Sequence, residues 1–221
     1  REIIEPNLKI IEIYMAVFFV LASIGILRDL NTYKESHLYI GQGDSTLISF
    51  RGKNYLIDTG GARQENKIAE KFLFPTLKLR GLTKIDGIFI SHFDEDHAGN
   101  LNKILKKYSV DNIFISHLPE EPEILEEAEK FSNIVILKKG DKVKILGDTI
   151  AEVLSDSENS EEENDNSMVL LINHRDFKTL FTGDISENVE KKINRDIDIL
   201  KVAHHGSKTS TSKEFLENTS P

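Results

Sequence analysis

The stretch SHFDEDHAG, at residues 91–99, says most about how this chain folds. It follows an apolar segment expected to be a buried strand, and it places four side chains of metal-ligand type within six residues: His92, Asp94, Asp96 and His97. Where a chain leaves a strand, alternate residues point the same way, so residues 92, 94 and 96 can converge while the loop turns His97 inward. Such imidazole and carboxylate ligands suit zinc, manganese or iron. A solvated acidic loop would explain the acids but not two histidines at this spacing.

The segment before this stretch has a counterpart near the C-terminus. Residues 85–92 (IDGIFISH) align without a gap with residues 197–204 (IDILKVAH), and residues 55–60 (YLIDTG) resemble residues 179–184 (TLFTGD). In each pair an apolar strand runs into a histidine or into a turn that contains glycine. Two similar halves would bring both strand-end histidines to one edge of the fold, where they can converge.

Three further polar residues follow apolar segments in the second half: Asp184, His204 and His205. An Asp after Gly is common as a turn residue or helix N-cap, but with the histidines upstream Asp184 is predicted to bridge two metal ions. The alignment of the halves favours His204 as a metal ligand. His205 is then a candidate for substrate contact or proton transfer, although the two roles can be exchanged. Asp94 or Asp184 is expected to orient an attacking water, so Asp94, Asp184 and His205 are the catalytic candidates.

The rest of the chain alternates short apolar runs with turn signals. A hairpin is expected at 47–57, with helices at 64–79 (kinked at Pro75), 100–108 and 120–131. Further strands are expected at 113–116, 134–137, 142–146, 150–154, 168–173 and 178–182. Helices interleaved with two groups of strands predict a layered α/β domain. The acidic run at 155–166 is expected to be a flexible, solvated loop.

An unbroken apolar run of 15 residues lies near the N-terminus, from Ile13 to Leu27. It has three interpretations: the last helix of a membrane region, a buried apolar helix, or the core of a signal peptide. The first is favoured, and the absence of a small-residue cleavage site after the run weakens the third. Residues 1–35 are therefore expected to form an apolar helix and a linker, and residues 36–221 a separate folded domain.

Composition limits the possible chemistry and partners. The absence of cysteine excludes disulfide partners, zinc–thiolate sites and cysteine nucleophiles, so a metal must rest on imidazole and carboxylate ligands. A net charge of −9 disfavours broad, unassisted binding of nucleic acid. However, the stretch 155–166 holds six of the acids and no base, which leaves room for a basic face elsewhere.

Taken together, the motifs resemble the metallo-β-lactamase superfamily and, within it, the C-terminal domain of ComEC-type DNA-uptake competence proteins. The resemblance covers roughly residues 36–221 and rests on six motifs in the family's order: IGQGDS (40–45), LIDTG (56–60), SHFDEDHAG (91–99), NSMVL (166–170), TGD (182–184) and KVAHHGS (201–207). It implies an αββα sandwich of two similar halves, truncated at its C-terminus and preceded by an apolar helix.

The resemblance also implies a ligand set for two divalent ions. One ion would be held by His92, Asp94 and Asp184. The other would be held by Asp96, His97, Asp184 and His204. Asp94 stands where the wider superfamily usually has His, which favours manganese more than an all-histidine site would, so the two ions are expected to be manganese or zinc. Asn166 and Ser167 occupy the place of a further ligand histidine in the wider superfamily, and with Ser207 they are predicted to contact substrate.

The activity implied is two-metal hydrolysis of phosphodiesters, namely a nuclease that acts on DNA during uptake. The implied partners are DNA and a membrane channel portion of the same or an associated protein. The implied location is membrane-associated, with the domain outside the cytoplasm in a Gram-positive-like topology. One alternative is a metallohydrolase of a small-molecule ester, lactone or phosphocholine. Another is a non-catalytic module that guides DNA or anchors partners.

Overall fold

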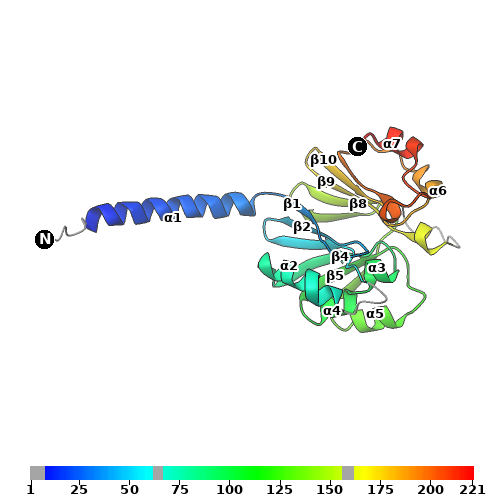
Figure 1. The fold of residues 1–221 in the computed structure, drawn as a ribbon, viewed down its shortest axis with the longest axis horizontal. Coiled ribbons are helices and arrows are strands. Elements are labelled where there is room, and N and C mark those ends of the chain that lie inside the picture. Colours follow the sequence, from blue (N-terminus) through cyan, green and yellow to red (C-terminus); the bar gives the residue numbers. More distant parts are fainter. Residues whose placement is uncertain (1–7, 62–66, 156–161) are drawn as a thin grey trace.

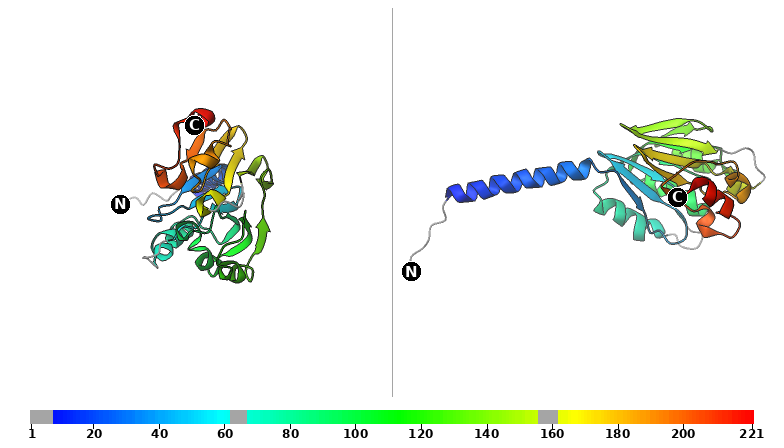
Figure 2. Two further views of the ribbon diagram at one scale, coloured as in Figure 1. Left: turned by 90° about the vertical axis from the view of Figure 1, so that its right-hand side faces the viewer. Right: turned by 90° about the horizontal axis from the view of Figure 1, so that it is seen from above.

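The computed structural model describes residues 8–61, 67–155 and 162–221, and it shows a long helix projecting from a domain of two packed sheets (Figure 1). This helix is α1 (Leu8–Leu30), and the right-hand view of Figure 2 shows again that it extends away from the domain. By length and composition α1 could cross a membrane, and none of its apolar window Ile11–Arg28 is buried. The structure therefore gives no support to the interpretation of this segment as a buried helix.

The first sheet contains six strands in sequence order. The strands are β1 (Lys34–His37), β2 (Thr46–Phe50), β3 (Lys53–Ile57), β4 (Lys84–Phe89), β5 (Ser109–Ile115) and β6 (Asn133–Ile136). Strands β1 to β3 pair antiparallel and include the expected hairpin, whereas β3 to β6 pair parallel.

The second sheet contains five strands in the order β11-β10-β9-β8-β7. They are β7 (Lys142–Leu146), β8 (Thr149–Ser155), β9 (Val169–His174), β10 (Phe177–Phe181) and β11 (Ile199–Lys201). Only β10 and β11 pair parallel in this sheet, as β3 and β4 do in the first. These two parallel pairs are the segments that align in the sequence, so the two halves are related in the way the alignment predicted.

Short helices cover the outer face of each sheet (Figure 1). The first sheet carries η1 (Ala69–Leu73, a π-helix), α2 (Phe74–Leu79), α3 (Glu95–Ala98), α4 (Leu101–Leu105) and α5 (Glu123–Ala128). The second half carries η2 (Glu163–Asn166) and η3 (Ala203–Gly206), which are 3-10 helices, with α6 (Glu187–Glu190) and α7 (Lys213–Thr219). The predicted αββα sandwich is confirmed.

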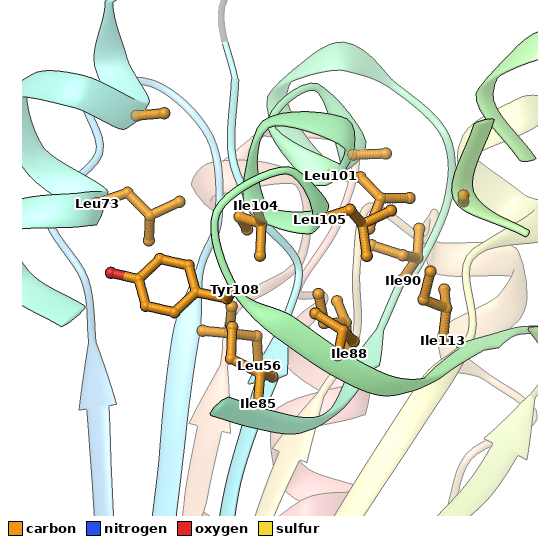
Figure 3. Close-up of a cluster of buried hydrophobic side chains, with 14 of the residues drawn as sticks. Leu56, Leu73, Ile85, Ile88, Ile90, Leu101, Ile104, Leu105, Tyr108 and Ile113 are labelled. Carbon is orange, nitrogen blue, oxygen red and sulfur yellow. The ribbon is translucent and has the colours of Figure 1, made fainter. Parts of the chain in front are cut away.

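Alternation along the strands builds the core in three layers, because successive residues point to opposite faces of a sheet. Leu56 and Ile88 face the helices of the first half, where Leu101 and Leu105 meet them (Figure 3). Their neighbours Ile57 and Phe89 face the other way and pack between the sheets with residues such as Leu170 and Phe181. A third cluster, which includes Leu171, Leu180, Val189 and Phe215, joins the second sheet to α6 and α7.

The helix expected at 64–79 is divided at Pro75. Residues 62–66 lie outside the described residues, and the remainder consists of η1 followed by α2. The backbone N–H of Phe74 donates to the carbonyl of Ala69, which is the wider π-helical turn. Pro75 then occupies the first turn of α2, where its missing N–H costs least.

Part of the acidic run is ordered, contrary to the prediction of a flexible loop. Residues 156–161 lie outside the described residues, but Glu163–Asn166 form η2. Asp165 accepts hydrogen bonds from the backbone N–H and the hydroxyl of Ser186, at 2.7 and 3.0 Å. These bonds fix η2 against the turn that precedes α6.

The layer between the sheets can be tested at Phe89, which is fully buried and stacks on Phe114 with ring centroids 4.6 Å apart. Phe89→Ala should lower the free energy of unfolding by about 3–5 kcal/mol, because the neighbouring strands cannot collapse into the cavity. Urea unfolding followed by circular dichroism measures this. Leu79→Ala is the control, because Leu79 is 89% exposed. Equal stability of the two variants would contradict this account of the core.

Candidate metal centre

The polar side chains of both halves meet where β4, β10 and β11 end. His92 follows β4, and α3 then carries Asp96 and His97 back across the strand ends. Asp184 follows β10, and η3 begins two residues after β11 with Ala203. The segments that carry these side chains are short, so the position of each side chain is set by the strand that precedes it.

Four residues form a compact group in which one ligand atom from each lies within 4.8 Å of the others: Asp96, His97, Asp184 and His205. His97 Nε2 lies 3.2 Å from Asp184 Oδ1. His205 Nε2 lies 3.1 Å from Asp96 Oδ2 and 3.6 Å from Asp184 Oδ2. Asp184 therefore lies between the histidine of the first half and that of the second.

His92 and Asp94 extend this group on one side. His92 is fully buried, its ring centroid is 4.2 Å from that of His97, and its Nε2 lies 3.7 Å from Asp94 Oδ2. Asp94 precedes α3 and its side chain is half exposed. The structure thus places His92 and Asp94 beside Asp96, His97 and Asp184, and the role of these five residues as metal ligands stays a prediction.

Among the described residues, three buried atoms of the site make no hydrogen bond, namely His92 Nε2, His97 Nε2 and Asp184 Oδ1, although the last two face each other as an ion pair at 3.2 Å. A polar atom buried without a partner costs about 1–3 kcal/mol, so such atoms are rare in folded proteins unless something binds them. Imidazole nitrogen and carboxylate oxygen are the donors that zinc and manganese accept. The residues present therefore fit a divalent metal ion.

Asp58 contacts the His97 imidazole at Nδ1, on the side away from Asp184. Its Oδ2 lies 2.9 Å from His97 Nδ1, and it accepts hydrogen bonds from the N–H and the hydroxyl of Ser91 at 2.8 and 2.9 Å. An ionised carboxylate only accepts, so Nδ1 of His97 carries a proton and Nε2 is the nitrogen left for a ligand bond. Asp58 has a φ of 58°, a left-handed conformation that the surrounding bonds maintain.

Ser167 supports the other imidazole. Its hydroxyl accepts from the backbone N–H of Asp184 at 3.1 Å and lies 3.3 Å from His92 Nδ1. Ser167 is fully buried, and these contacts orient two candidate ligands. Asn166 donates through its side-chain amide to Glu163 at 3.4 Å, and the Ser207 hydroxyl lies 2.9 Å from that of Thr209. Substrate contact by Asn166, Ser167 and Ser207 stays a prediction.

The two adjacent histidines of η3 are placed differently. Both have left-handed backbone angles, with φ of 49° for His204 and 51° for His205. His205 joins the four-residue group, whereas His204 Nε2 lies 4.0 Å from Asp184 Oδ2 and its side chain is 38% exposed. The predicted ligand role of His204 stays a prediction, with His205 the closer of the two to the group.

Asp44 lies next to His205 and is itself paired with Lys201, and sequence reasoning gave neither Asp44 nor Lys201 a role. Asp44 Oδ1 lies 3.7 Å from His205 Nδ1, and Asp44 Oδ2 accepts from the Lys201 ammonium at 2.6 Å. The loop of Asp44 can come close to α3 because Gly43 has no side chain. A Cβ at this position would collide with the carbonyl oxygen of Asp96. The only sequence signal for Asp44 and for Asp58 is that each acid lies in a motif at the end or start of a strand.

The pKa values reflect these contacts in the metal-free protein. Hydrogen bonds to Asp44 and Asp96 raise the pKa of His205 to about 9. Burial lowers the pKa of His97, but the carboxylates of Asp58 and Asp184 outweigh it and hold that pKa well above the ordinary value. The hydrogen bond to His205 lowers the pKa of Asp96 to about 2. Without metal, the site therefore contains imidazolium–carboxylate pairs at neutral pH.

A cavity of about 490 Å³ adjoins Asp94 on the outer side of α3. Its walls are acidic, with carboxylates from Glu95, Glu120, Glu121 and Glu163. Such a surface repels anions.

Comparison with known proteins agrees with this geometry. Residues 38–221 match the family described as the metallo-beta-lactamase superfamily. The chain is 32% identical over 207 residues to ComE operon protein 3 of Bacillus subtilis, covering 82% of this chain and 26% of that protein. It is 32% identical over 199 residues to Recombination protein 2 of Haemophilus influenzae, covering 86% of this chain and 23% of that protein. The chain thus spans about a quarter of the length of these relatives.

The fold is also that of solved structures. The diiron β-hydroxylase CmlA from Streptomyces venezuelae superposes with a TM-score of 0.51 at 17% identity, covering 76% of this chain and 34% of CmlA. That likeness concerns the fold alone. The resemblance to ComEC-type competence proteins that the motifs indicated is confirmed by the named relatives. With the family match over most of its length, the chain belongs to the metallo-β-lactamase superfamily.

Proposed function

We propose that this domain is a metal-dependent hydrolase that cleaves phosphodiester bonds in DNA. The observation that carries the proposal is the convergence of Asp96, His97, Asp184 and His205, beside the buried His92 Nε2, which makes no hydrogen bond in the described part of the chain. Competence-type relatives support DNA as the substrate class. A hydrolase of this family that acts on another ester would share the same centre, so the substrate must be decided by assay.

The proposed ligand set follows the two sides of the group. His92, Asp94 and Asp184 would hold one ion, and Asp96, His97, Asp184 and His205 would hold the other, with His204 as the alternative to His205. Three carboxylates in the set make it harder than an all-histidine site, which favours manganese over zinc. When bound, the ions supply Lewis acidity toward a phosphoryl oxygen and the positive charge that a chain of net charge −9 lacks.

The residues of the chain would then orient the reactants and hold protons. Asp94 and Asp184 are placed to orient an attacking water, because both carboxylates lie next to the buried imidazoles. His204 lies at the rim, partly exposed and 4.0 Å from Asp184 Oδ2. With His205 as ligand, His204 is the side chain available to donate a proton to the leaving oxygen.

We further propose that residues 1–35 anchor the domain formed by residues 36–221 to a membrane. The exposed apolar surface of α1 supports this, because a helix of its 23 residues is long enough to span the bilayer core. A channel portion of the same or an associated protein is the proposed neighbour, with the domain outside the cytoplasm.

The activity itself is tested by incubating the purified chain with single- and double-stranded DNA, a chromogenic phosphodiester and a lactone, each with manganese or zinc. We expect manganese-dependent cleavage of DNA that Asp184→Asn and His97→Ala abolish. Asp176→Asn, at an exposed turn, is the matched control and should retain activity. Cleavage of the lactone alone would identify another kind of metallohydrolase, and metal binding without any turnover would identify a non-catalytic module.

Asp58→Asn should weaken metal binding about 10- to 100-fold, because it removes the carboxylate that orients His97 without removing a ligand. Isothermal titration with Mn²⁺ measures the affinity, and Asp176→Asn again provides the control. An affinity equal to that of the unsubstituted chain would show that Asp58 does not position the site.

Metal binding at pH 7 should release protons, since neutral imidazole is the ligand form and both His97 and His205 are protonated in the metal-free protein. Titration in two buffers of different ionisation enthalpy counts the protons, and His205→Gln should release fewer. The free energy of unfolding of the metal-free fold should also depend on pH and should decrease as the pH rises. The raised pKa of His205 stabilises it fully below pH 6.5, and this contribution is lost as the pH rises through about 9. Metal binding that releases no protons would contradict the ligand assignment.

A further inference from the structure

A groove of about 740 Å³ lies at one end of the domain, away from the metal centre. It is lined by the turn between β2 and β3, the segment between α2 and β4, and the first residues after α1. The charged residues in its lining are Lys34, Arg51, Lys53, Arg80, Lys84 and Asp86. We name this surface the basic groove.

The basic groove has a positive excess in a chain that is acidic as a whole. Asp86 is the only acid in its lining and pairs with Lys53 at 2.6 Å. Lys84 pairs at 2.6 Å with Asp111, which lies outside the groove, and both Lys53 and Lys84 keep more than two fifths of their side-chain surface exposed. The groove therefore attracts anions even after these pairs are counted.

The basic groove is fixed to the end of α1. Asn31 donates through its amide to the carbonyl of Leu27 at 2.7 Å, and its side-chain oxygen accepts from Arg51 Nε at 2.8 Å. Thr32, which lines the groove, donates to the carbonyl of Arg28 at 2.8 Å. Lys34 follows the apolar part of α1 by so few residues that the chain can separate them by about 20 Å at most. The basic groove therefore begins directly after the apolar part of α1.

The rim of the basic groove carries a leucine, Leu79, that does not pack into the core of the domain. Leu79 is 89% exposed and stands between two exposed cations, Lys78 and Arg80. An apolar side chain among cations is typical of surfaces that bind the headgroup region of a bilayer. An apolar side chain makes no favourable polar contact with a phosphodiester backbone. The metal centre also lies elsewhere, since α2 is near α1 whereas α3 is farther from it (Figure 1).

We propose that the basic groove docks on anionic phospholipid headgroups of the membrane that α1 enters, with Leu79 inserted in the interface. The inference rests on the proposed membrane span of α1 and is independent of the proposed nuclease chemistry. Docking would hold the domain close to the bilayer and turn the metal centre away from it.

The chain contains no tryptophan, so Leu79→Trp introduces a single indole reporter at the rim. The full chain with this substitution is reconstituted into vesicles of phosphatidylcholine mixed with phosphatidylglycerol. We expect the indole emission to shift to shorter wavelength and to be quenched by brominated lipids. Leu118→Trp is the matched control, because Leu118 is 66% exposed and lies outside the groove, and its emission should remain unquenched.

Charge variants test the electrostatic part in the Leu79→Trp background. Arg80→Glu combined with Lys84→Glu should abolish the quenching, and so should vesicles of phosphatidylcholine alone. Lys191→Glu combined with Lys192→Glu changes the net charge equally at the end of α6 and should leave the quenching intact. Quenching that persists in the groove variant would overturn the proposal.

Retention of the chain after alkaline washing of the vesicles tests the membrane span separately. A retained chain with an unquenched indole would overturn the docking alone, and a chain that is washed off would overturn both. A single-stranded oligonucleotide that protects the indole, where the vesicles do not, would overturn the docking and mark a nucleic-acid surface instead. DNA cleavage on the same vesicles is scored independently, so failure of the nuclease proposal is distinguishable from failure of the docking.

Discussion

The contact between Asp58 and His97 Nδ1, at 2.9 Å, is the interaction on which the site depends. It joins the end of β3 to α3, and it fixes an imidazole whose side chain is fully buried. With Nδ1 occupied in this way, Nε2 can only face Asp184 and the centre. In the metal-free protein, that nitrogen and the Asp184 carboxylate form a buried ion pair at 3.2 Å. The same contact thus decides which nitrogen of His97 is directed toward Asp184 and, on the proposed function, toward a metal ion.

The two halves of the fold together bring more polar side chains to the site than one half could. A single strand end can present only a few side chains, whereas two parallel pairs, β3–β4 and β10–β11, end at the same edge of the sandwich. The first half supplies His92, Asp96 and His97, and the second supplies Asp184 and His205. Asp184 lies between them. The acidic groups are tolerated because imidazolium or metal ions compensate their charge, which holds the pKa of Asp96 near 2.

Much of this organisation was readable in the sequence, and the remainder was not for definite physical reasons. The motif at 91–99 and the aligned strands predicted the sandwich and the meeting of strand-end side chains from both halves, because strand periodicity is local. The choice between His204 and His205 was not predictable, since both residues adopt left-handed angles that end the register of the aligned strand. Asp58 was missed because its role comes from a tertiary contact with His97. The order in η2 was missed because Asp165 is held by Ser186, far along the chain.

The domain therefore has two ends with different chemistry, a basic groove beside α1 and a cluster of carboxylates and imidazoles where β4, β10 and β11 end. The central claim is that His92 Nε2, His97 Nε2 and Asp184 Oδ1 are metal ligands. Anomalous diffraction from crystals of the chain soaked with Mn²⁺ tests it most directly. The account predicts two anomalous peaks, both within bonding distance of Asp184, with one next to His92 and the other next to His97. Absence of peaks at Asp184, with manganese bound elsewhere on the chain, would contradict it.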